Sequence, residues 1–311
     1  MNGIINVLKP PGMTSHDVVD FIRRTCGLKK AGHTGTLDPG AAGVLVICLG
    51  VATRLARFFL EDDKEYRAEI TFGLSTSSGD AYGDITGESD ATNLTEDTVR
   101  AVLPLFTGII GQTPPMTSAL KRHGKKLYEL ARAGKVVERE ERVVNIYDLK
   151  FIWGTGWGGP RPSALLHISC QKGVYVRSLC DDIGASLGCG AYMSFLVRTR
   201  AGPFNISESH TLEELLTASS AGNIREKVIA MNDALSIFPA VVVKRSSVLP
   251  VLSGAKLYPP GVFRIPEGLV EGERVRLVGP EGLLAVAETT FEPDDRGRFV
   301  FKPICTLARQ N

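Results

Sequence analysis

Residues 31–45 read AGHTGTLDPGAAGVL, and no other stretch of the chain is as informative. The stretch is a glycine-rich loop with one imidazole, His33, and one acid, Asp38, and it runs into an apolar strand predicted over residues 44–49. Four glycines and a proline in fifteen residues bury little surface and lose much backbone entropy on ordering. Such a loop is typical of a site whose geometry serves chemistry, so Asp38 is the first candidate for that chemistry.

Read singly, the two side chains also have structural interpretations. An Asp-Pro pair commonly opens a turn, and a lone histidine is commonly a satisfied structural residue. Motifs elsewhere in the chain are needed to distinguish a structural role of these two residues from a catalytic one.

The elements around the loop indicate a protein of mixed α and β structure. A strand is predicted over residues 4–8, and a helix follows to Cys26, capped by Thr14 or Ser15 and ended by Gly27. Residues 52–60 fit a helix. Residues 65–72 alternate as a strand does, which places Tyr66 on the inward face.

The sequence beyond residue 75 also predicts both helices and strands. Residues 75–98 are rich in Ser, Thr, Gly and Asp and are expected to form a long loop. Helices are predicted over residues 95–106 and 124–134, and between Lys172 and Gly188 after a strand end. Strands are predicted over residues 143–153 and 164–170.

Chain length and composition indicate two domains. The 311 residues are 43% hydrophobic, and the pattern changes near Pro239 to short strands separated by Gly/Pro turns. We therefore expect a domain of residues 1–238 and a small, mostly β domain of residues 239–311.

The cysteine and charge patterns indicate the cellular compartment and the chemistry of the binding partner. The six cysteines show no C-x-x-C spacing, and neither a membrane span nor a secretory signal is recognised, which favours reduced thiols and a cytoplasmic protein. The net charge is only +2, but residues 121–135 hold six basic residues against Glu129 alone. This basic element predicts local contact with phosphates.

Five further motifs, in order along residues 3–198, resemble those of one family. Together with residues 31–45, they are similar to the TruB family of tRNA pseudouridine synthases, and the end of the chain more loosely resembles a PUA-like domain. The matching stretches are KPPGMTS at 9–15, KEYR at 64–67, SALK at 118–121 with GKKLY at 124–128, KGVYVRSL at 172–179, and LGCGA at 187–191 followed by Leu196 and Arg198.

The resemblance implies a fold and a reaction. The fold is an α+β pseudouridine synthase domain with a large mixed, mainly antiparallel central sheet, followed by a small PUA-like β domain, with an RNA-clasping insertion at about residues 108–142. The reaction isomerises uridine 55 in the T-loop of tRNA to pseudouridine. Nothing is gained or lost overall, so we expect no cofactor and no metal.

The resemblance also assigns roles to residues. Asp38 would be the catalytic carboxylate, either as nucleophile or as the base that removes the C2′ proton. Arg177 would pair with it and keep it ionised, and Tyr66 would stack on the uracil and is a candidate to help move the C5 proton. The remaining candidates are Leu196 packing on the base, His33 filling the space that the flipped base leaves, and RNA-side contacts from Tyr175, Lys9, Lys121, Lys125 and Lys126; of these, Lys9 is expected mainly to support the loop.

The expected partner is the T-arm stem-loop of tRNA. We expect no membrane contact, no guide RNA and a monomeric protein. Two positions depart from the family pattern, and both concern RNA contacts: Thr117 replaces a common tyrosine, and Thr76-Ser77-Ser78 replaces a common T-D-T. Two alternatives stay open. They are a guide-RNA-dependent synthase and a non-catalytic tRNA-binding or tRNA-folding protein on the same scaffold.

Overall fold

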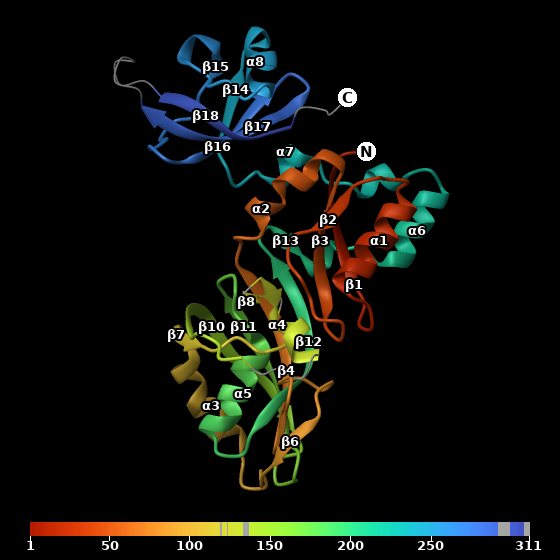
Figure 1. Cartoon of the computed structure of the whole chain (residues 1–311), viewed down its shortest axis with the longest axis vertical. Coiled ribbons are helices and arrows are strands. Elements are labelled where there is room, and N and C mark those ends of the chain that lie inside the picture. Colours follow the sequence, from red (N-terminus) through yellow and green to blue (C-terminus); the bar gives the residue numbers. More distant parts are fainter. Residues whose placement is uncertain (119, 123, 133–136, 292–298, 308–311) are drawn as a thin grey trace.

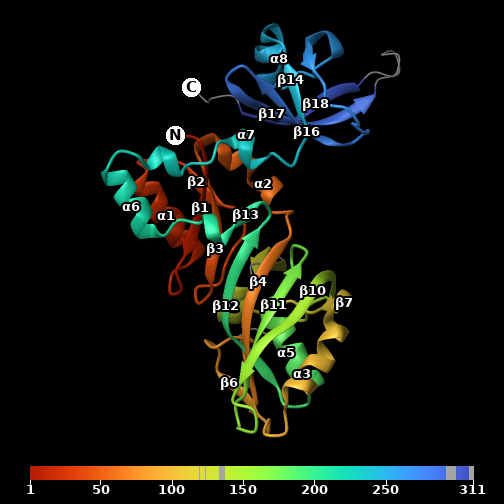
Figure 2. The same ribbon diagram turned by 180° about the vertical axis from the view of Figure 1, so that it is seen from behind.

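The computed structural model describes residues 1–118, 120–122, 124–132, 137–291 and 299–307. The molecule is elongated, with a long twisted sheet through most of its length and a separate small sheet at one end (Figures 1 and 2). Among the described residues, no helix is long and apolar enough to span a membrane.

The main sheet is mixed and almost wholly antiparallel, as the family resemblance implies. Its strands follow the order β1 (Gly3–Lys9), β3 (Ala42–Leu49), β12 (Ala191–Ala201), β4 (Lys64–Phe72), β11 (Ser163–Cys170), β10 (Arg142–Thr155) and β7 (Gly108–Gln112). Two short strands extend it, because β2 (Ala31–His33) pairs with β3 and β13 (Phe204–Asn205) with β12. In the described part of this sheet, only β12 and β3 pair in parallel.

Helices cover the sheet in two groups that enclose separate cores. α1 (Ser15–Thr25) and α6 (Leu212–Ser220) lie together beside β1 and β3 (Figure 1), where Val18 and Ile22 pack with Leu215. α5 (Val176–Ser186) and α3 (Glu96–Val102) cover the other half, where residues of β4, β11 and α5 form the largest core. Thr14 caps α1 through a capping box with Asp17, which settles the choice between Thr14 and Ser15.

The second sheet is built from the C-terminal residues. Its order is β15 (Val262–Arg264), β14 (Ala240–Val243), β16 (Arg274–Gly279), β17 (Gly282–Phe291) and β18 (Phe299–Thr306). It has its own apolar core, which includes Val241, Leu277 and Phe301. Arg274 Nη1 lies 2.8 Å from Glu61 Oε2 across the junction with the larger part of the chain.

Three local predictions need correction. The segment predicted as a loop over residues 75–98 contains a hairpin, β5 (Leu74–Thr76) and β6 (Ile85–Glu88), held by polar bonds such as Asp84 N–H to Ser77 Oγ (3.1 Å) instead of an apolar face. Residues 52–60 form a 3-10 helix, η1 (Gly50–Leu55), and a short α2 (Ala56–Phe59). The strand end expected at Lys172 lies earlier, at Cys170 of β11, and the chain turns at residues 172–173 before α5 begins.

The remaining elements are short. The helix predicted over residues 124–134 is α4 (Leu127–Arg132), and the expected cap at Gly134 lies outside the described residues. The others are η2 (Leu103–Phe106), β8 (Lys121–Arg122), β9 (Lys125–Lys126), η3 (Ile206–Glu208), η4 (Ile224–Lys227), α7 (Met231–Ala234), η5 (Arg245–Ser247), α8 (Val248–Leu252) and η6 (Pro259–Gly261).

Candidate active site

The Asp38 loop connects β2 to β3, next to the parallel pairing of β3 with β12. Gly43 lies opposite Arg198 of β12, and its φ of +109° lies in the region that favours glycine. A Cβ on Gly43 would lie 2.6 Å from the Arg198 nitrogen, closer than side chains approach backbone atoms. This glycine is therefore needed for β3 to pair with β12 where the loop enters β3.

Two side chains from the N-terminal motif hold the Asp38 loop from one side. Ser15 Oγ both donates to the carbonyl of Leu37 (3.0 Å) and accepts from its N–H (2.9 Å). The Lys9 ammonium is fully buried and donates to the carbonyls of Pro39 (3.1 Å) and Ala41 (2.6 Å), and also to Pro10 (2.9 Å). The backbone on both sides of Asp38 is thus fixed.

These contacts correct the expected RNA contact of Lys9. All three of its hydrogen-bond donors are used by carbonyl groups inside the protein, and no part of the side chain is exposed. Burial lowers the pKa of Lys9 to about 8, against the raising effect of Asp38. Lys9 therefore supports the loop.

Arg198 holds the loop from the opposite side. Its guanidinium is buried and donates to the carbonyls of Gly35 (3.1 Å), Thr36 (3.3 Å) and Val44 (2.8 Å). A planar group with five donors can bind three carbonyls at once, and these carbonyls lie on both sides of Asp38 in the chain. With Ser15 and Lys9, it leaves the loop little freedom.

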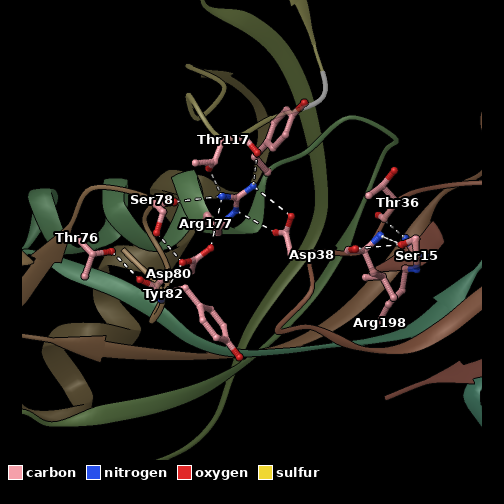
Figure 3. A network of polar contacts seen from close by, with 12 residues as sticks. Ser15, Thr36, Asp38, Thr76, Ser78, Asp80, Tyr82, Thr117, Arg177 and Arg198 are labelled. Atoms are coloured by element: carbon pink, nitrogen blue, oxygen red, sulfur yellow. Dashed lines mark hydrogen bonds and ion pairs between the residues drawn. The ribbon is translucent and has the colours of Figure 1, made fainter. Parts of the chain in front are cut away.

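Arg177 makes a two-point ion pair with Asp38. Arg177 Nε lies 3.0 Å from Asp38 Oδ2, and Nη2 donates to Oδ1 at 3.3 Å (Figure 3). Arg177 stands in the first turn of α5 and its side chain is only 6% exposed, whereas the Asp38 side chain is 33% exposed. The pair thus presents an oriented carboxylate to solvent from a buried cation.

The far side of the Arg177 guanidinium contacts three further residues. Nη1 lies 3.5 Å from Asp80 Oδ2, and it also donates to the carbonyl of Ser78 (3.3 Å) and to the hydroxyl of Thr117. Asp80 is itself held, since its Oδ1 accepts from Ser78 Oγ (2.6 Å) and from the N–H of Tyr82 (3.0 Å). Figure 3 shows this network reaching from Thr76 to Asp38 through Arg177.

The environment raises the pKa of Asp38 above its usual range. Burial is the largest cause; the Arg177 charge opposes it, the Asp80 charge adds to it, and Lys9 opposes it. The expectation that Arg177 favours the ionised form is correct in sign, but burial and the second carboxylate outweigh it. A carboxylate that is partly buried and shares its cation with a second carboxylate is more basic than a free one.

Tyr66 and Leu196 lie on one face of the sheet beside this pair. Leu196 is opposite Ala68 in the β12–β4 ladder, and Tyr66 is opposite Arg198, which places both side chains on the same side. Both pack in the cluster that contains Leu37 and Val176, the neighbours of Asp38 and Arg177. Burial raises the pKa of the Tyr66 phenol. The structure therefore brings Asp38, Arg177, Tyr66 and Leu196 together.

The other candidates lie at the edges of this group. His33 ends β2, and its Nδ1 accepts from Gly35 N–H (3.3 Å) while burial lowers its pKa. Tyr175 precedes α5, and both of its backbone groups bind the side chain of Gln112 (2.7 and 3.0 Å). The side chains of the three lysines, Lys121, Lys125 and Lys126, lie outside the described part of the structure.

The sequence interpretation gave no part in positioning Asp38 or Arg177 to three residues of the site: Asp80, Thr117 and Arg198. Arg198 stands in a motif, but its partners are carbonyls, which sequence patterns do not reveal. Asp80 lies two residues beyond Ser78, in the loop that departs from the family pattern. Among the described residues, no cluster of three or more His, Cys, Asp or Glu could hold a metal ion.

The fold and this site define the class of the protein as a pseudouridine synthase. A solved H/ACA RNP bound to a substrate RNA containing 2′-deoxyuridine includes a chain that matches with a TM-score of 0.74 and 28% identity, over 99% of this chain and 85% of that one. A chain of a Cbf5-Nop10-Gar1 complex matches equally well, with 30% identity over 98% and 85%.

Within that class, the chain belongs to the TruB family. Residues 23–176 match the N-terminal domain of TruB family pseudouridylate synthase, residues 177–236 the C-terminal domain of tRNA pseudouridylate synthase B, and residues 239–295 a PUA domain. The tRNA pseudouridine synthase B of Pelotomaculum thermopropionicum is 66% identical over 100% of this chain and 98% of its own length. That of Symbiobacterium thermophilum is 51% identical over 82% of each.

Proposed function

We propose that this chain converts uridine 55 in the T-loop of tRNA into pseudouridine and that Asp38 is the catalytic group. The observation that carries this proposal is the two-point pair of Asp38 with the buried Arg177, in a loop fixed by Ser15, Lys9 and Arg198. The similarity to proteins named tRNA pseudouridine synthase B supports the choice of substrate.

The reaction needs one well-placed carboxylate. The N1–C1′ bond of the uridine breaks, the uracil turns, and C5 bonds to C1′ while the C5 proton is lost and N1 gains a proton. Asp38 either attacks the nucleotide or takes the C2′ proton to start this sequence. Arg177 holds the carboxylate in position, Tyr66 stacks on the uracil as a candidate for moving the C5 proton, and Leu196 packs on the base.

Access to the site requires the target base to leave the T-loop. Flipping costs a few kcal/mol, which a stacking group in the vacated space offsets. His33 suits this role, since burial lowers its pKa and favours the neutral imidazole, and it lies five residues before Asp38. Lys121, Lys125 and Lys126 would contact RNA phosphates from the insertion at about residues 108–142.

The two parts of the chain, each built around one sheet, would have different roles. Residues 1–238 would hold the catalytic machinery, and residues 239–311 would add a second RNA contact. We expect a monomer that works in the cytoplasm without a cofactor.

Incubation of the purified chain with unmodified tRNA, without cofactor or guide RNA, tests the proposal. Chemical mapping should find pseudouridine at position 55 and none in a tRNA whose position 55 is cytidine. Absence of pseudouridine from the T-loop would overturn the proposal. Tight tRNA binding without modification would support the non-catalytic alternative.

One observation favours a second candidate, because the structure resembles chains from H/ACA and Cbf5 complexes. A guide-dependent enzyme would modify RNA only when a guide is added. Modification of tRNA in the guide-free assay would exclude this candidate.

A further inference from the structure

Tyr82 is a large aromatic side chain that the protein leaves open to solvent beside the catalytic loop. The residue is 77% exposed, and it stands in the turn between β5 and β6. Tyrosine normally buries much of its ring. An exposed aromatic ring in a fixed place is therefore a candidate contact surface.

The backbone of Tyr82 is tied to the catalytic network. Its N–H donates to Asp80 Oδ1 (3.0 Å), and the other oxygen of Asp80 lies 3.5 Å from Arg177 Nη1. Figure 3 shows the ring extending away from Arg177 on the side of Asp80. Since the tie uses the backbone, replacing the Tyr82 side chain leaves this hydrogen bond possible.

The end of the ring rests on Gly40, which is two residues beyond Asp38. A Cβ on Gly40 would lie 2.6 Å from Tyr82 Cζ and 2.7 Å from Oη, so the ring can lie there only because residue 40 has no side chain. Two residues of extended chain span at most about 7 Å. The Tyr82 ring and Asp38 are therefore neighbours on one surface, and the lack of a side chain at Gly40 leaves the space that the ring occupies.

We propose that Tyr82 is a stacking platform for a nucleobase of the substrate RNA next to the flipped uridine. This inference rests on the proposed function. Flipping one base leaves its neighbours in the loop without a stacking partner. A flat ring beside Asp38 supplies one, and stacking tolerates any base because every base has a π-face. A protein partner is less suited to this place, because the substrate RNA must reach Asp38.

Binding of a T-arm hairpin to variants of Tyr82 tests the platform. Loss of one stacked base corresponds to a rise in Kd of about 5- to 150-fold for Tyr82→Ala. Tyr82→Phe keeps the ring and should bind within about twofold of the wild type, whereas Tyr82→Leu, apolar but not aromatic, should bind about as weakly as Tyr82→Ala. Gly40→Ala should also weaken binding in the wild type, and add nothing in the Tyr82→Ala background.

Hairpins with a single abasic nucleotide identify the stacked base. The effect of Tyr82→Ala should vanish for the one hairpin that lacks that base, which a general folding defect would not produce. A Tyr82→Ala Kd within twofold of the wild type, or a loss of equal size on every abasic hairpin, would overturn the inference while wild-type turnover still supports the proposed function. A wild type that binds the hairpin but does not modify it would overturn only the proposed function, and one that does neither would overturn both.

Discussion

Replacing Arg177 by lysine removes one of two contacts to Asp38 and keeps the charge. The guanidinium reaches both carboxylate oxygens, at 3.0 and 3.3 Å, and a lysine ammonium would reach one. A hydrogen bond to a charged group contributes about 1.5–3 kcal/mol. If orientation of Asp38 limits the chemical step, Arg177→Lys should slow it by about 10- to 150-fold.

The assay is single-turnover release of tritium from C5-labelled uridine in a T-arm hairpin, with enzyme in excess, because C5 loses its hydrogen in the reaction. Arg161→Lys is the matched control. Arg161 also pairs with a carboxylate, at 2.9 Å from Glu88, but the pair is exposed on the surface and should contribute little. An Arg177→Lys rate within twofold of the wild type would refute the reasoning, as would an equal loss in Arg161→Lys.

Three other predictions address the surroundings of the site. Lys9→Met removes the donor from buried carbonyls and should lower stability by about 2 kcal/mol in denaturant unfolding, whereas the exposed Lys29→Met should not; equal effects would contradict the anchoring role. Turnover needs ionised Asp38 and so rises with pH through its pKa; because the Asp80 charge raises that pKa, Asp80→Asn should move the acid limb of the pH–rate profile to lower pH, and an upward or absent shift would be contrary. Lys125→Ala should reduce the salt dependence of RNA affinity by up to about one phosphate contact, and an unchanged slope would remove this lysine from the RNA surface.

Much of the fold was predictable because its signals are local. Thr14 and Gly27 mark the ends of α1 as capping chemistry requires, and the alternation from Tyr66 to Phe72 gives the orientation of β4. The β5–β6 hairpin was missed because it is held by polar bonds and shows no apolar alternation. The parallel pairing of β3 with β12 joins residues about 155 positions apart, which no local pattern encodes.

The site residues were likewise predictable where a local motif marks them, and not where their role depends on the folded structure. Asp38, Arg177, Tyr66 and Leu196 stand in recognisable motifs, and the structure brings them together. The roles of Lys9 and Arg198 depend on which carbonyls surround their buried charges, and only the folded chain supplies that information. The raised pKa of Asp38 likewise follows from burial and from the charge of Asp80, and the family resemblance indicates neither of these effects.

The most direct test of the account is Asp38→Asn, which keeps the shape of the side chain and removes its charge and basicity. Turnover should fall by at least about 1,000-fold, since the amide can neither attack nor accept the C2′ proton. The Kd for the T-arm hairpin should stay within about tenfold of the wild type, a change of about 1.4 kcal/mol or less. Retained pseudouridine formation in Asp38→Asn, or a loss of binding as severe as the loss of turnover, would contradict the catalytic role of Asp38.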